Sequence, residues 1–72
     1  MKKLANVSVG KFSTVYGSYY YTQQYDDFNI SCTILKRKLG TFTDTYLLGL
    51  EGSSANIQMF LEYLKFNKFK IH

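Results

Sequence analysis

Residues 48–66, LGLEGSSANIQMFLEYLKF, constrain the fold of this chain more than any other stretch. They read as the end of a strand, a Gly-Ser turn and one amphipathic helix. A serine in the turn offers an N-cap, and the apolar residues after it recur at the spacing of one helical face. We predict a helix over about 54–66, with a buried stripe of Ile57, Phe60, Leu61 and Leu64. No other segment offers a clear helical surface, so the remaining apolar residues must pack against this one.

Three further segments alternate between apolar and polar residues, which is the pattern of strands with one buried face. They span about residues 4–9, 28–36 and 42–50, and a short last strand is expected where Phe69 and Ile71 alternate with Lys68, Lys70 and His72. The side chains expected to face inward are Ala5, Val7, Val9, Phe28, Ile30, Cys32, Ile34, Tyr46, Leu48 and Leu50.

Two turns set the expected pairing of these strands. A five-residue loop over 37–41 makes a hairpin of its neighbours and places Leu50 opposite Phe28. The pair Gly10-Lys11 is typical of a tight hairpin turn and places Thr14 opposite Val7.

Residues 13–27 leave two interpretations open. Their β-branched and aromatic content favours a strand, whereas Phe12, Val15, Tyr16 and Tyr19 have the spacing of a helical face. We predict an α+β fold in a single domain, residues 1–72, with an antiparallel sheet of four to five strands and one C-terminal amphipathic helix packed on one face. The alternative is a ferredoxin-like βαββαβ plan with a second helix in 13–25.

Residues suited to catalysis or metal binding are scarce. The chain has one cysteine, Cys32, on a predicted inner face, and one histidine, His72, at the terminus. Asp26 and Asp27 are neighbours in a predicted turn, and no zinc or calcium spacing occurs. We therefore expect a non-enzymatic protein without cofactor or metal.

Hydropathy argues against a membrane location. No apolar run approaches the roughly 20 residues of a membrane span, and the residues after Lys2-Lys3 are too polar for a signal peptide. We expect a cytoplasmic protein that does not bind membranes.

The net charge of +4 gains meaning from the predicted topology. The hairpin loop, the end of the helix and the end of the first strand should meet at one pole of the molecule. Six cations would converge there: Lys11, Lys36, Arg37, Lys38, Lys65 and Lys68. Such a pole suits an anionic partner, either nucleic acid or an acidic protein surface, although lysine-rich loops also serve solubility alone.

The face of the sheet opposite the helix bears on the kind of partner. For the predicted hairpin it reads Asn29, Ser31, Thr33, Leu35, Thr43, Thr45 and Leu47, without an aromatic side chain for base stacking. A second candidate surface consists of Tyr19, Tyr20, Tyr21 and Tyr25. Tyrosine is enriched at protein interfaces, so we expect protein contact rather than base stacking.

Residues 28–72 resemble the second half of small ferredoxin-like domains. The resemblance rests on Asn29-Ile30 in a strand, on Leu48, Leu50 and Gly52, and on the helical pattern from Ile57 to Lys65. NIL and ACT-type regulatory domains carry a similar strand, glycine turn, helix and closing strand. The resemblance implies a βαββαβ plan, small ligands such as amino acids, and homodimers formed through sheet edges.

These observations give one main functional expectation and two alternatives. The main one is a small binding module that acts on a larger protein or protein–nucleic acid complex, such as a virus- or plasmid-encoded modulator of a host nucleic-acid-handling complex. Direct nucleic-acid binding through the basic pole is the first alternative. A ligand-sensing regulatory domain is the second.

Overall fold

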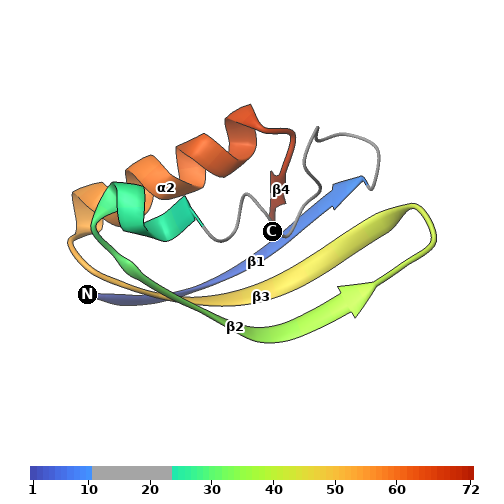
Figure 1. The fold of residues 1–72 in the computed structure, drawn as a ribbon, viewed down its shortest axis with the longest axis horizontal. Helices are drawn as coiled ribbons and strands as arrows, with labels where there is room; N and C mark the ends of the chain where they lie inside the picture. The colour runs from blue at the N-terminus through green and yellow to red at the C-terminus, as the bar shows by residue number, and fades with distance from the viewer. Residues whose placement is uncertain (11–23) are drawn as a thin grey trace.

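The computed structural model describes residues 1–10 and 24–72, which form a sheet with one long helix against it (Figure 1). The first strand, β1, spans Lys2–Gly10. A short 3-10 helix, η1, spans Gln24–Phe28 and precedes strand β2, Ser31–Leu39, and strand β3, Thr43–Glu51. Helix α2, Ser54–Phe66, and the two-residue strand β4, Lys70–Ile71, complete the fold.

The four strands lie in the order β2-β3-β1-β4, and every neighbouring pair is antiparallel. Strands β3 and β4 are therefore parallel to each other, with β1 between them and α2 as their connection. A split β-α-β arrangement of this kind also occurs in ferredoxin-like folds. Both α2 and η1 lie on the same side of the sheet, and none of the other described elements covers the opposite side (Figure 1).

Helix α2 confirms the predicted bounds and the predicted stripe. Its four buried residues are Ile57, Phe60, Leu61 and Leu64. Ser53 is the N-cap, and its hydroxyl oxygen accepts a hydrogen bond from the Asn56 N–H at 3.1 Å. Phe60 is wholly buried and meets Phe28 of η1 edge to face, with ring centroids 5.5 Å apart.

The inward residues of β1 and β3 are also confirmed. Ala5, Val7 and Val9 are buried on β1, and Tyr46, Leu48 and Leu50 are buried on β3. The core thus forms between these two central strands and α2, with Ile30 and Phe69 at its margin. The predicted α+β fold, an antiparallel sheet with one C-terminal helix packed on it, is correct.

Strand β2 begins later than predicted. Phe28 belongs to η1 rather than to the strand, and the backbone then reverses at Asn29, which has a positive φ of 56°. The Asn29 N–H donates to the Asp26 carbonyl at 3.2 Å. Asparagine tolerates this left-handed conformation better than most residues, so the chain can turn before Ile30 enters the core.

The register of the β2-β3 hairpin differs from the prediction by four residues. Leu50 pairs with Cys32, not with Phe28, because β2 continues through its charged residues to Leu39. An edge strand tolerates charged residues. The turn is accordingly shorter, and Gly40 lies at its start, where a Cβ would meet the Thr43 carbonyl oxygen at 2.5 Å.

Thr14, which the predicted hairpin places opposite Val7, lies outside the described residues. Val7 has a described strand on each side. It is paired with Tyr46 of β3 and with Ile71 of β4. The second helix of the ferredoxin-like alternative, in 13–25, falls almost entirely outside the described residues. The last two residues of that range belong to η1.

Candidate functional site

The side of the sheet opposite α2 and η1, which we call the open face, is the principal candidate site. Its side chains come from alternate residues of the same strands that build the core. The pairing places them in rows across the sheet. One row joins Lys38, Thr45, Ser8 and Lys70, and the next joins Lys36, Leu47, Asn6 and His72.

The first row has a lysine at each outer strand, and the second has one at β2 only; the groups between are neutral polar or apolar. Lys36 and Lys38 come from β2, whereas Lys70 comes from β4 on the opposite edge of the sheet. A groove of about 520 Å³ is lined here by Asn6, Lys36, Arg37, Lys38, Thr45 and Leu47. All of these except Arg37 belong to the open face by register.

An irregularity in β2 explains why two lysines lie on this face. The pairing passes from Ile34 opposite Leu48 directly to Lys36 opposite Leu47, so Leu35 is an extra residue in a β-bulge. Without the bulge, strict alternation would turn Lys36 and Lys38 toward the helix side. With it, Leu35, Lys36 and Lys38 all belong to the open face.

The net positive charge of the described residues is concentrated on the open face. Four lysines there, Lys2, Lys36, Lys38 and Lys70, stand against one carboxylate, Glu51, which leaves three net positive charges. The helix side carries four cations and four carboxylates, and is neutral; these are Lys3, Arg37, Lys65, Lys68, Asp26, Asp27, Asp44 and Glu62.

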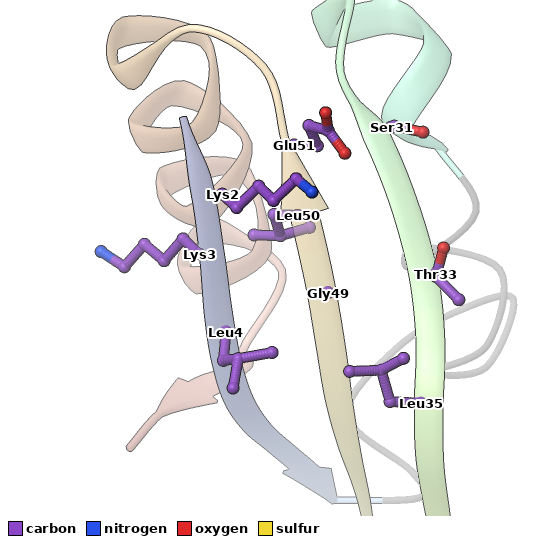
Figure 2. Close-up of a pocket in the computed structure, with 9 residues that line it drawn as sticks. All are labelled: Lys2, Lys3, Leu4, Ser31, Thr33, Leu35, Gly49, Leu50 and Glu51. Carbon is purple, nitrogen blue, oxygen red and sulfur yellow. The ribbon is translucent and has the colours of Figure 1, made fainter.

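A second groove, of about 310 Å³, occupies the other half of the open face. Figure 2 shows Leu4 of β1 and Leu35 of β2 on either side of Gly49 of β3. A Cβ at Gly49 would lie 3.3 Å from the Leu35 Cδ1, so glycine keeps the floor of this groove low. Lys2 extends across the end of the groove toward Glu51, while Lys3 points away from it (Figure 2).

The structure does not gather the predicted basic pole on one surface. Lys36 and Lys38 lie on the open face, whereas Lys65 and Lys68 lie at the end of α2, on the other side of the sheet. The Lys65 ammonium is 3.6 Å from the Glu62 carboxylate. Arg37 is paired with the buried Tyr46, which assigns it to the helix side. Lys11 lies outside the described residues.

The tyrosine surface is only partly described. Tyr19, Tyr20 and Tyr21 lie outside the described residues. Tyr25 is half-buried in η1 and packs against the core. Asp44 is buried on the inner face of β3.

Two side chains with nucleophilic chemistry merit separate description. Burial raises the pKa of the Cys32 thiol from 9.0 to about 11, which disfavours the reactive thiolate. The Ser8 hydroxyl lies 2.7 Å from the His72 Nε2. Among the described residues Ser8 is the only hydrogen-bond partner of that imidazole, so no third group orients it as a catalytic triad would require.

In the part of the chain that the structure describes, no three His, Cys, Asp or Glu residues are grouped so that they could hold a metal ion. Within the same ranges, no helix has the length and apolar character needed to cross a membrane.

Sequence reasoning did not identify Lys2, Lys70, Asn6, Ser8 or His72 as parts of the site. Lys70 and His72 alternate with Phe69 and Ile71, so their polar face could be read from the pattern. The pattern does not show which strand β4 pairs with. Only its pairing with β1 brings Lys70 into the same row as Lys38.

Comparisons with protein families, with curated proteins and with solved structures find no significant match to this chain. The geometry and charge of the open face are therefore the basis for inferring function.

Proposed function

We propose that this protein is a non-enzymatic binding module that attaches to a larger protein through the open face of its sheet. The observation that carries the proposal is the division of charge, since the open face has three net positive charges and the helix side of the described residues has none. A partner with an acidic surface would be attracted to this face and oriented on it.

The mixture of side chains on the open face also supports a protein partner. Leu4 and Leu35 remain 66% and 54% exposed, and they lie beside the lysine rows rather than apart from them. Protein interfaces commonly combine an apolar centre with a polar rim. The raised pKa of the Cys32 thiol, which disfavours the reactive thiolate, favours a binding role over a nucleophilic one at this residue.

Direct nucleic-acid binding is a second candidate, because the same lysines could contact phosphates. Lysines on both outer strands, Lys36 and Lys38 on β2 and Lys70 on β4, favour it. The described part of the open face, however, offers no phenylalanine or tyrosine on which a base could stack. This second candidate would therefore depend chiefly on contacts between the lysines and the phosphates.

Affinity capture from an extract of the native host tests the proposal. The immobilised wild-type protein is compared with a Lys36→Glu/Lys38→Glu/Lys70→Glu variant. A Lys65→Glu/Lys68→Glu variant serves as the matched control, because it reverses exposed lysines on the helix side. We expect proteins, identified by mass spectrometry, that the wild type and the control retain and that the open-face variant loses.

Two outcomes would contradict the proposal. Equal retention by the open-face variant would show that the open face is not the site. Loss of all captured proteins after nuclease treatment of the extract would favour the nucleic-acid candidate instead.

A further inference from the structure

We infer that the open face recognises an acidic protein segment with one apolar side chain, held over Gly49 between Leu4 and Leu35 while its carboxylates lie against Lys36, Lys38 and Lys70. The inference rests on the proposed function and specifies the chemistry of the partner. It joins the two grooves of the open face into one site with an apolar half and a cationic half.

The apolar half is shaped for a single side chain. Its volume, about 310 Å³, is at the lower end of the range of small-molecule pockets. Gly49 forms its floor without a side chain, and Leu4 and Leu35 form two walls (Figure 2). A leucine or similar residue placed there would bury its own apolar surface together with that of both walls.

The strand geometry fixes the spacing between the anchor and the charges. Along a strand each residue advances about 3.3 Å, so Leu47 is about 7 Å and Thr45 about 13 Å from Gly49. Lys36 is paired with Leu47 and Lys38 with Thr45. An extended segment lying along β3, with its apolar residue over Gly49, would therefore present carboxylates to the lysines from its second and fourth following residues.

Charge decides between occupants of the open face. A second copy of this chain would bring three net positive charges against three, and like charges across an interface are strongly disfavoured. A nucleic-acid strand would satisfy the lysines but would leave the Leu4–Leu35 groove without an apolar partner. An acidic segment with an apolar anchor is complementary to both halves.

The size of the open face is compatible with such a partner. Strands β1 and β3 have nine residues each, which corresponds to about 30 Å of extended chain. Neighbouring strands lie about 4.8 Å apart, so the face accommodates one extended segment along β3 with room for side chains on both sides.

Short synthetic peptides test the inference by isothermal titration calorimetry. The first peptide carries one leucine followed by glutamate at the second and fourth positions. The second peptide has serine in place of leucine, and a short oligothymidylate is the third probe. We expect the leucine peptide to bind about tenfold more tightly than the serine peptide, since one apolar side chain is buried.

Variants of the protein separate the two halves of the site. Leu4→Ser and Gly49→Val should remove the preference for leucine and leave the salt dependence of binding unchanged. Lys36→Gln/Lys38→Gln should weaken the salt dependence and leave the preference for leucine intact. Leu4 is two-thirds exposed, so Leu4→Ser is expected to fold. It therefore tests the leucine preference even if Gly49→Val does not fold.

Equal affinities for the leucine and serine peptides would overturn the inference, as would tighter binding of the oligothymidylate than of either peptide. These failures differ from failure of the proposed function. If a host protein is captured through the lysines but the leucine preference is absent, the proposed binding function is retained and the inferred apolar side chain of the partner is rejected. If capture does not depend on the lysines, the proposed function itself is wrong.

Discussion

Leu47 and Leu48 are neighbours in β3, but they lie on opposite faces of the sheet and in different chemical surroundings. Leu48 is fully buried under α2, while Leu47 is half-buried beside Lys36 on the open face. The buried side chains of the covered face are apolar apart from Asp44, and the open face mixes leucines, hydroxyls and lysines. One face therefore determines whether the chain folds, and the other is free to vary with the partner.

Substituting these two leucines gives the largest expected contrast. Leu48→Ala should lower the free energy of unfolding by about 2–5 kcal/mol, because it leaves a cavity in the core. Leu47→Ala should lower it by less than about 1 kcal/mol. Urea denaturation followed by circular dichroism measures both. Equal losses would mean that the open face is packed against something in the folded protein.

Two glycines give the next contrast. Gly52 has φ +158°, and a Cβ there would lie 2.8 Å from the Ile30 Cγ2, so Gly52→Ala should cost about 1–3 kcal/mol of stability. At Gly49 the nearest atom belongs to the exposed Leu35 side chain, which can move. Gly49→Ala should leave stability unchanged or raise it by up to about 1 kcal/mol. Melting temperatures of the two variants rank them directly.

A smaller, pH-dependent effect on the free energy of unfolding is expected from Cys32, which lies on the covered side. Its pKa is raised from 9.0 to about 11 by burial, so between these values the unfolded chain loses the proton while the folded chain keeps it. Stability should therefore fall as pH rises from about 9 to about 11. Cys32→Ala should remove this component, which denaturation curves at several pH values can isolate from the titration of tyrosines and lysines.

The same shift predicts slow chemistry at this thiol. A rise of about two pKa units leaves roughly a hundredfold less thiolate near neutral pH. Native protein should react with iodoacetamide far more slowly than protein unfolded in urea. Similar rates in the two states would show that the Cys32 side chain is not shielded.

The smallest effect on stability is expected from the open-face lysines. Lys36→Gln/Lys38→Gln/Lys70→Gln should change the free energy of unfolding by less than about 0.5 kcal/mol for each site. At low salt the change should favour folding slightly, because like charges are removed. A cooperative loss of stability would instead assign these lysines to the fold and would weaken the case for a binding face.

Local patterns predicted the covered face well. In β1, the alternation correctly places the buried Ala5, Val7 and Val9. In α2, the helical spacing from Ile57 to Leu64 correctly places all four buried residues of the helix. Burial of apolar side chains has a fixed period in strands and in helices, so it is visible in a single sequence.

The open face was harder to predict because it depends on pairing. The bulge at Leu35 shifts the pattern by one residue, and nothing in the residues 31–39 marks it. The partner of β4 also had to be known before Lys70 could join Lys38. The order of the elements along the chain predicted which end of the molecule the lysines occupy. Which face of the sheet they occupy follows only from the strand register.

The bulge also has a consequence for how such a chain can change over generations. Leu35 is the unpaired residue, so an in-frame deletion of its single codon would leave the pairs on both sides intact, from Ile34 with Leu48 to Lys36 with Leu47. The lysines would keep their positions while the apolar wall disappeared. One codon could thus change which partners are accepted without altering the fold.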